Sequence, residues 1–313
     1  MDKISQYEHI LKRLQREEFV SGSALAVDLG VSRTVINRRL QELSSMGLRT
    51  DAISGRGYRL DERVKLLDVS ALTIPQGFQF QRHLITASTN DDVLALLRLA
   101  SHPVIVTTEF QSGGRGRRGR AWQNAFGQDL AVSFGFPIEG VEGIKPYSVI
   151  AGFALAKALK GWGLENVGVK WPNDLYVNDG KIAGVLTELH TLPSGVMYVV
   201  MGVGMNINRK DFSAVDQAAT SLAREMGHEV SRTDVLGLIV SVLGDLIKSQ
   251  FAQYDAQEWK PFDVLYERQI DVLQGENIRS GIAQGVAHDG SLWFVCNGER
   301  TALNGGEISV RPK

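Results

Sequence analysis

The chain has 313 residues, 43% of them hydrophobic, which is enough to bury the cores of two or three domains. Its 34 Lys and Arg residues balance 35 Asp and Glu residues, which excludes a protein that binds polyanions over its whole surface. The single cysteine, Cys296, excludes an internal disulfide framework and lies in an apolar run that predicts a buried thiol. Without a leader pattern or a long apolar run, the chain is expected in the cytoplasm, with no membrane contact.

The N-terminal sequence predicts three short helices followed by a hairpin. The helical spacing of apolar residues and the presence of suitable caps predict helices over residues 3–16, 22–29 and 33–46. Two short extended runs follow within residues 48–60. Gly30 permits a tight turn after the second helix, and Ser32 is a suitable N-cap for the third. This order indicates a winged helix-turn-helix domain in residues 1–62.

The polar face of the third predicted helix carries side chains that reach phosphates and base edges in a DNA major groove. The candidate DNA-binding residues are Ser32, Arg33, Thr34, Asn37 and Arg38 in the helix region and Arg56 in the wing, and Arg39 is placed on the same polar face. Six arginines against two acidic residues give residues 33–59 a net charge of +4. The alternative is a helical triplet that makes protein contacts only.

Strands and helices alternate in the middle of the chain, which predicts an α/β domain with a mixed sheet in residues 63–267. The predicted strands are residues 104–110, 130–137, 167–171, 181–189 and 196–203, and the predicted helices are residues 90–100, 147–162 and 234–254. In residues 268–313, Asp-Gly and Asn-Gly pairs separate short apolar runs and favour type I′ hairpins, which predicts a small SH3-like β-barrel. The chain is therefore predicted to be an α+β protein of three domains.

Residues 113–122 (GGRGRRGRAW) carry the densest chemical signal. Gly114, Gly116 and Gly119 satisfy the G-x-G-x-x-G pattern, but no helix is predicted to follow, which excludes a dinucleotide-binding fingerprint. The intervening arginines repel one another, so the loop is expected to be poorly ordered until a polyanion binds. Glycines that admit phosphate closely and arginines that neutralise it suit the joining of a carboxylate to a triphosphate. An RNA-binding run is the alternative.

A second motif, residues 170–174 (KWPND), follows a predicted apolar strand. Lys170 would point into a cleft at the end of the sheet, although an ordinary strand-end lysine that reaches solvent is the alternative. Asp174 could hold Mg²⁺ or simply form a turn. Trp122 could stack on adenine, although a lone tryptophan more often belongs to a core.

Several motifs in chain order resemble those of the biotin protein ligases. They are Ser88-Thr89-Asn90, Gln111, the Arg/Gly loop at residues 114–122, KWPND, Lys181-Ile182-Ala183-Gly184 and Gly305-Gly306-Glu307-Ile308-Ser309. Together with the helix-turn-helix, they make the whole chain similar to the bifunctional bacterial form, a ligase and biotin operon repressor. The resemblance implies a catalytic domain similar to the class II synthetases.

The resemblance also implies roles for individual residues. Biotin would be bound by Ser88, Thr89, Asn90, Gln111, Arg115, Gly116, Arg117, Lys170 and Gly204. ATP and the adenylate would be bound by Arg118, Arg120, Trp122, Lys170 and Asn206, and a nucleotide loop would fall around residues 209–221. Arg117 and Lys170 would be the catalytic residues.

The implied reaction uses biotin and ATP as substrates, with Mg²⁺, and transfers biotin to a lysine of the biotin carboxyl carrier protein of acetyl-CoA carboxylase. The implied partners are this carrier, operator DNA of the biotin operon and a second copy of the chain, with dimerisation favoured by the adenylate. Two alternatives remain open: a ligand-sensing repressor without ligase activity, and a lipoate ligase of related fold.

Overall fold

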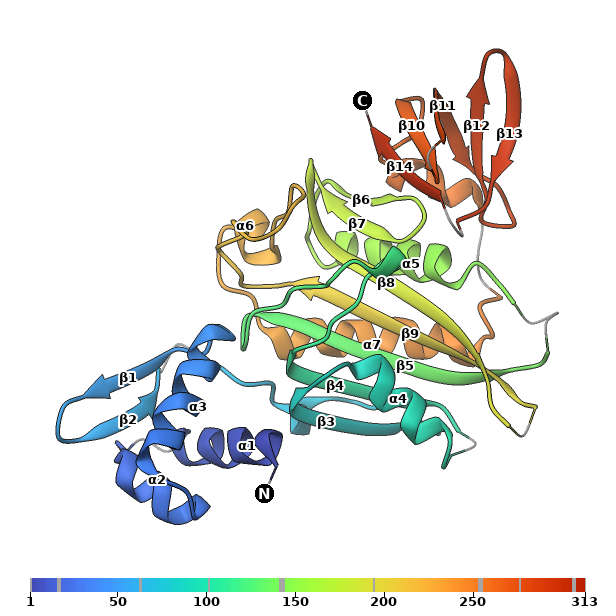
Figure 1. Ribbon diagram of the computed structural model, residues 1–313. Coiled ribbons are helices and arrows are strands. Elements are labelled where there is room, and N and C mark those ends of the chain that lie inside the picture. Colours follow the sequence, from blue (N-terminus) through green and yellow to red (C-terminus); the bar gives the residue numbers. More distant parts are fainter. Residues whose placement is uncertain are drawn as a thin grey trace.

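A computed structural model describes residues 2–15, 18–61, 64–100, 102–140, 144–193, 195–252, 256–275, 277–305 and 308–312. It contains sheets of two, seven and five strands, which follow one another along the chain (Figure 1). The two-stranded sheet belongs to an N-terminal unit, the seven-stranded sheet to a central unit and the five-stranded sheet to a C-terminal unit. A search of these residues finds no helix with the length and apolar character that a bilayer span requires.

The N-terminal unit is the predicted winged helix-turn-helix. Its elements are α1 (Lys3–Leu14), α2 (Gly22–Leu29), α3 (Arg33–Ser45), β1 (Thr50–Ile53) and β2 (Gly57–Leu60). The Ser21 hydroxyl accepts a hydrogen bond from the backbone N–H of Ala24 and begins α2, and Gly30 ends it at φ 64°. Ser32 caps α3 in the same way, through the N–H of Val35. Local capping therefore determines both ends of α2 and the start of α3, as the sequence predicted, whereas α1 ends at Leu14, before the predicted end.

The position predicted for Arg39 is wrong. Its side chain is buried, where Nε donates to Gln6 at 2.7 Å and Nη1 donates to Glu42 at 2.9 Å. The hydroxyl of Tyr7 also donates to Glu42, at 2.7 Å. Arg39 therefore ties α3 to α1 inside the unit and is withdrawn from the DNA-facing surface.

The core of the N-terminal unit includes side chains from the central unit. Leu84, Ile85 and Phe126 pack with the buried residues of α1, α2 and α3, and Phe126 is only 1% exposed. The backbone N–H of Phe126 donates to the carbonyl oxygen of Met46 at 2.8 Å. Side chains of both units therefore form this apolar cluster, which is separate from the main core of the central unit.

The central sheet has the strand order β3-β4-β5-β9-β8-β7-β6, in which only β3 and β4 are parallel. Its strands are β3 (Gln79–Thr86), β4 (Val104–Gln111), β5 (Asp129–Ile138), β6 (Val167–Lys170), β7 (Asp174–Val177), β8 (Gly180–Thr191) and β9 (Met197–Asn206). Helices α5 (Tyr147–Gly161) and α7 (Arg232–Lys248) pack together on one face, and α4 (Thr89–Leu97) packs on the other against β4, β5 and β9. The mixed α/β prediction is confirmed.

Some central elements differ from the prediction. The strands β3 and β7 and the short helix α6 (Leu222–Met226) were not predicted. Helix α7 ends at Lys248, six residues before the predicted end, and the last two predicted residues lie outside the described chain. Gln250 and Phe251 follow α7 with φ of 51° and 56°, a conformation that cannot continue a helix.

The C-terminal unit is a sheet of order β13-β12-β11-β10-β14. Its strands are β10 (Gln269–Gln274), β11 (Asn277–Val286), β12 (Leu292–Cys296), β13 (Glu299–Leu303) and β14 (Ile308–Pro312). Asn297 and Gly298 join β12 to β13 with φ of 52° and 85°, as the predicted type I′ turn requires. The outer strands β13 and β14 do not pair with each other in the described residues, so the predicted closed barrel is not confirmed. Cys296 is half-buried rather than buried.

Candidate active site

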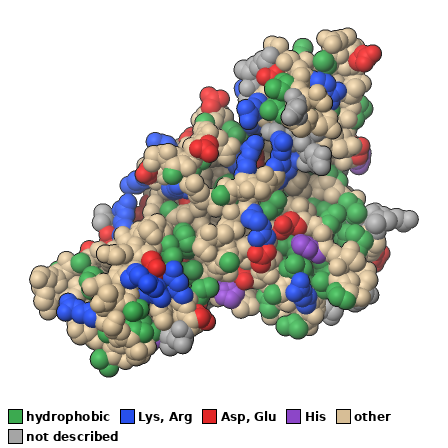
Figure 2. Space-filling model, viewed as in Figure 1, with side chains coloured by type: hydrophobic (Ala, Val, Ile, Leu, Met, Phe, Trp, Pro, Cys, Tyr) green, Lys and Arg blue, Asp and Glu red, His purple; other side chains and the backbone are tan. Residues whose placement is uncertain are grey.

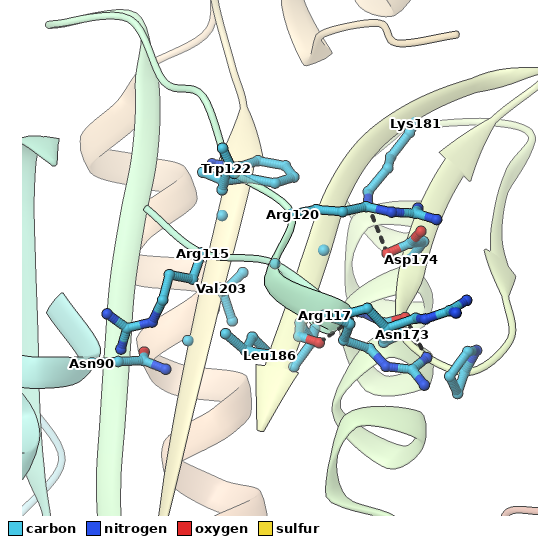
Figure 3. Close-up of a pocket in the computed structure, with 18 of the residues that line it drawn as sticks. Asn90, Arg115, Arg117, Arg120, Trp122, Asn173, Asp174, Lys181, Leu186 and Val203 are labelled. Carbon is cyan, nitrogen blue, oxygen red and sulfur yellow. Dashed lines mark hydrogen bonds and ion pairs between the residues drawn. The ribbon is translucent and has the colours of Figure 1, made fainter. Parts of the chain in front are cut away.

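A pocket lies on the face of the central sheet that carries α4, and it brings the two predicted motifs together (Figure 3). Its lining contains twelve of the thirteen residues predicted to bind biotin or the nucleotide, together with Asp174: Ser88, Thr89, Asn90, Gln111, Arg115, Gly116, Arg117, Arg118, Arg120, Trp122, Lys170 and Gly204. The thirteenth, Asn206, is absent from the lining. Figure 2 shows Lys and Arg side chains along the hollow between the central and C-terminal units.

The Arg/Gly loop is folded as a hairpin across this pocket. The N–H of Trp122 donates to the carbonyl of Gly114 at 2.8 Å, and the N–H of Gly116 donates to the carbonyl of Arg120 at 2.7 Å. The tip is a short 3₁₀ turn, in which Arg118 adopts a left-handed conformation at φ 59°. Arg115, Arg117 and Arg120 leave the hairpin in different directions (Figure 3).

Arg117 lies at the tip of the hairpin and crosses to two other parts of the chain. Its guanidinium donates to Oδ1 of Asn173 in the KWPND turn at 3.3 Å and to the carbonyl of Gly305 in the C-terminal unit. Burial lowers the pKa of Arg117, although the carboxylate of Asp174 opposes this effect. Arg117 therefore places a positive charge in a poorly hydrated part of the pocket.

Lys170 ends β6 and enters the same pocket, as its position in the sequence predicted. Its Nζ lies 5.3 Å from the centre of the Tyr176 ring. Burial lowers the pKa of Lys170, and the attraction of Asp174 acts in the opposite direction. A desolvated ammonium group interacts more strongly with an anionic substrate than an exposed one does.

Trp122 packs closely against β9 at Gly204. A Cβ atom at position 204 would lie 2.4 Å from the indole ring, so the close approach requires glycine. The indole Nε1 is buried and has no hydrogen-bond partner among the described residues, and Nζ of Lys181 lies 5.5 Å from the ring centre. The Trp122 side chain therefore lines the pocket with its N–H unsatisfied by the described residues, and its ring is the part that could stack on a ligand.

The predicted biotin-binding residues on α4 and β4 form a polar network with Ser133, which sequence reasoning missed. The fully buried Ser133 hydroxyl lies 2.7 Å from Oγ1 of Thr89 and 2.6 Å from Oδ1 of Asn90. Oε1 of Gln111 accepts hydrogen bonds from the N–H and hydroxyl of Thr89 at 3.3 and 3.4 Å. Nδ2 of Asn90 donates to Glu188 at 2.6 Å. The side-chain amide of Asn90 therefore holds the Ser133 hydroxyl with its oxygen and the Glu188 carboxylate with its nitrogen.

Arg115 does not point toward the centre of the pocket but to the side where Asn90 lies (Figure 3). Its two terminal nitrogens contact both carboxylate oxygens of Asp91, at 2.6 and 2.9 Å. Glu188 lies 3.9 Å from the same guanidinium. No sequence motif pointed to a contact of Asp91 or Glu188 with the hairpin, because each is far from the hairpin along the chain.

Asn206 lies outside the pocket and is buried. Its Nδ2 donates to the carbonyl oxygens of Thr220 at 3.0 Å and of Lys181 at 3.3 Å. Asn206 therefore joins the end of β9 to the segment before α6, and this structure gives it no direct position against a nucleotide. Of the predicted motif at residues 305–309, Gly306 and Glu307 lie outside the described chain.

The described residues that line the pocket do not form a resident metal site. Asp174 is the only carboxylate among the described lining residues, and its Oδ1 lies 2.8 Å from Nζ of Lys181. Within the described ranges, no group of three or more His, Cys, Asp or Glu side chains could hold a metal ion. Magnesium prefers oxygen ligands in near-octahedral geometry, which an aspartate already paired to lysine does not supply.

The predicted DNA-binding residues lie at the surface of the N-terminal unit. Ser32, Arg33, Thr34, Asn37, Arg38 and Arg56 are all exposed. Ser32 also caps α3, and Oδ1 of Asn37 accepts a hydrogen bond from Tyr58 of β2 at 3.5 Å. The helix and the wing therefore present these groups on neighbouring surfaces.

Comparisons with known proteins agree with this geometry. Residues 83–206 match the Biotin/lipoate A/B protein ligase family, and residues 7–59 match an HTH domain. The chain is 30% identical to the bifunctional ligase/repressor BirA of Escherichia coli over 309 residues, covering 96% of each chain. It is 36% identical over 240 residues to the biotin–[acetyl-CoA-carboxylase] ligase of Mycobacterium tuberculosis, covering 71% of this chain and 85% of that one.

A solved structure shares the fold of about three quarters of this chain. The biotin protein ligase of Aquifex aeolicus, solved in complex with biotin and ATP, aligns with a TM-score of 0.62 and 21% identity. The alignment covers 76% of this chain and 100% of that structure. Because the identity to the Escherichia coli protein extends over almost the full length of both chains, this chain belongs to the bifunctional ligase/repressor family of biotin protein ligases.

Proposed function

We propose that this protein is an ATP-dependent biotin protein ligase that also represses transcription of the biotin biosynthesis operon. One observation carries the enzymatic part: the hairpin and the KWPND turn, about fifty residues apart, meet at one pocket. Six cationic side chains and a single described carboxylate line it, which suits a reaction between two anionic substrates. The cationic residues are Arg115, Arg117, Arg118, Arg120, Lys170 and Lys181.

In the first step, an oxygen of the biotin carboxylate attacks the α-phosphorus of ATP. A new P–O bond forms, the bond to pyrophosphate breaks, and biotinyl-5′-AMP remains. Arg117 and Lys170 are proposed to offset the charge of the carboxylate and the α-phosphate, because both are cationic, desolvated and close to the same turn. The network of Thr89, Gln111 and Ser133 is proposed to position the ureido ring of biotin.

In the second step, the neutral amine of a carrier lysine attacks the carbonyl of the mixed anhydride. An amide bond forms, AMP leaves, and the amine loses a proton. The proposed carrier is the biotin carboxyl carrier protein of acetyl-CoA carboxylase. The pocket needs no covalent nucleophile for either step. The hairpin is proposed to cover the adenylate and to keep water from it until the carrier arrives.

We expect Mg²⁺ to arrive with ATP and to keep most of its water ligands. The proposed role of Asp174 as a magnesium ligand would require its pair with Lys181 to rearrange. The proposed domain boundaries fall after residues 62 and 267.

Pyrophosphate release tests the enzymatic proposal. Purified protein with ATP and Mg²⁺ should release pyrophosphate only when biotin is added, and lipoate should not replace biotin. Release with lipoate alone would favour the lipoate ligase alternative. No release with either acid would favour a sensor without ligase activity.

For repression, we propose that the adenylate favours a homodimer whose two helix-turn-helix units bind a palindromic operator. A free edge supports this proposal. β7 pairs with β8 only between Gly180 and Gly184, and Asn173 hydrogen-bonds the backbone of Val185. No described strand pairs with that side of β8 beyond Val185. Leu186, on this uncovered part, also lines the pocket. Ultracentrifugation and operator-binding measurements with and without biotin and ATP test the proposal; equal dimerisation and affinity in both conditions would contradict it.

A further inference from the structure

The hairpin over the pocket is held at two separate places. At its tip, Arg117 contacts Asn173 and the carbonyl of Gly305. On the opposite side, Arg115 contacts Asp91 in the first turn of α4. Figure 3 shows Arg115 and Arg117 pointing to opposite sides of the pocket from the same hairpin. The hairpin therefore spans the pocket as a strap with an ionic attachment on the α4 side.

The attachment to α4 has the geometry of a bidentate arginine–carboxylate pair. Each terminal nitrogen of Arg115 contacts its own oxygen of Asp91, a pairing that fixes direction as well as distance. The hydrogen bonds from Arg115 lower the pKa of the Asp91 carboxyl, so it carries its charge at neutral pH. Glu188, at 3.9 Å, adds a second carboxylate beside the guanidinium.

In this structure the side chain of Arg115 is directed at Asp91 and Glu188 rather than at the centre of the pocket. Its charge is offset by two carboxylates, whereas Lys170 makes no ion pair with the described part of the chain. The positive charge available to the substrates therefore comes from the KWPND side of the pocket, which carries Lys170 and lies opposite Arg115 (Figure 3). In this structure the side chain of Arg115 therefore fastens the hairpin to α4.

We propose that Asp91 is a positioning residue that, through Arg115, holds the hairpin over the adenylate and so sets how long biotinyl-5′-AMP is retained. The inference rests on the proposed ligase function and extends it to a residue outside every recognised motif. Asp91 is not part of the pocket lining, and it reaches the pocket only through Arg115.

The exposure of the pair suits an attachment that opens in every catalytic cycle. The side chain of Arg115 is 42% exposed and that of Asp91 is 54% exposed. Exposed pairs contribute little free energy and are weakened by salt. A strap fastened in this way can open to admit substrates and to expose the adenylate to a carrier lysine. It also makes adenylate retention sensitive to ionic strength.

The test measures release of preformed biotinyl-5′-AMP from the full-length protein. The complex is formed with biotin and labelled ATP, separated from free nucleotide and diluted into unlabelled biotin, and the release rate is followed at low and high salt. D91N, which keeps the shape of the side chain and removes its charge, should release the adenylate about threefold to fivefold faster at low salt. The difference from the wild type should shrink at high salt.

The neighbouring carboxylate provides a matched control. Asp92 lies in the same turn of α4 but contacts His83, at 3.9 Å, and not the hairpin, so D92N should release the adenylate at the wild-type rate. R115Q should accelerate release, and D91N should add nothing in the R115Q background.

The outcomes separate this inference from the function on which it rests. Fast release by D91N, with no further effect in R115Q, supports the positioning role. Wild-type release by D91N, or additive effects of the two substitutions, overturns it while leaving the ligase function intact. A wild-type protein that forms no adenylate contradicts the proposed function itself, and the inference with it.

Discussion

The backbone N–H of Phe126 donates to the carbonyl oxygen of Met46 at 2.8 Å, at the C-terminal cap of α3. Trp122 lines the proposed adenylate pocket only four residues before Phe126, whose ring is buried in the core of the N-terminal unit. A short stretch of backbone therefore joins the hairpin directly to the helix that carries the candidate DNA-binding residues. Movement of the hairpin can be transmitted to that helix through packing.

Substitution of Phe126 should weaken this connection. F126A should lower the free energy of unfolding by about 3 kcal/mol or more, because it empties a buried aromatic site. F126L, a milder change, should fold and form the adenylate but reduce the stimulation of operator binding by biotin and ATP. F153L, at a buried phenylalanine of α5, is the control. Wild-type stimulation in F126L would contradict the proposed connection.

The alkaline limit of adenylate formation should depend on Lys170. Burial lowers the pKa of this lysine, so its charge is present below that pKa and is lost at a pH below the usual lysine range. The rate of biotin-dependent pyrophosphate release, measured without carrier, should fall as the pH rises through the lowered pKa of Lys170. D174N should move this fall in rate to lower pH, because it removes the carboxylate whose attraction raises the pKa of Lys170. K170R should abolish the fall; a profile identical to the wild type in K170R would exclude Lys170 as its source.

A methyl group at Gly204 should displace the Trp122 indole. The added Cβ would lie 2.4 Å from the ring, so the ring must move away from β9. G204A should raise the KM for ATP roughly tenfold or more. G161A is a suitable control, because a Cβ at Gly161 would meet nothing within 4 Å. An unchanged KM for ATP in G204A would argue against nucleotide binding at Trp122.

DNA binding should depend on the exposed face of α3 and not on the total positive charge. R33A and N37A should each weaken operator binding by roughly tenfold, and R33A should also reduce its salt dependence. Both variants should biotinylate the carrier at the wild-type rate. K12A removes an exposed charge from α1 and should leave DNA binding unchanged. Equal losses of operator affinity in R33A, N37A and K12A would instead indicate nonspecific electrostatic attraction to DNA.

The sequence predicted elements whose ends depend on local chemistry. Helix α2 begins at the Ser21 cap and ends at Gly30, and both residues act through their immediate neighbours. The strand β7 was missed because its four residues follow the KWPND turn directly and are stabilised by pairing with β6 and β8. Arg39 looked like part of a polar helix face, since Gln6 and Tyr7, which bury it, belong to another helix.

The candidate site was predictable where its chemistry lies in short motifs. Residues of the hairpin and the KWPND turn were found because arginine, glycine and lysine stand at unusual spacing within a few positions. Asp91, Ser133 and Glu188 were missed, because each supports the site from a different element. Asp91 follows the Ser88-Thr89-Asn90 motif directly, but nothing in the sequence relates it to the hairpin. Asn206 was placed against the nucleotide by resemblance, whereas here its amide contacts two backbone carbonyls.

The central claim is that this protein joins biotin to a lysine of a carrier domain at the expense of ATP. The most direct measurement is the intact mass of a purified biotin carboxyl carrier domain after incubation with the protein, biotin, ATP and Mg²⁺. The carrier should gain the mass of one biotinyl group, and it should gain none without ATP, with K170A, or when its acceptor lysine is replaced. A carrier of unchanged mass in the complete reaction would contradict the ligase function.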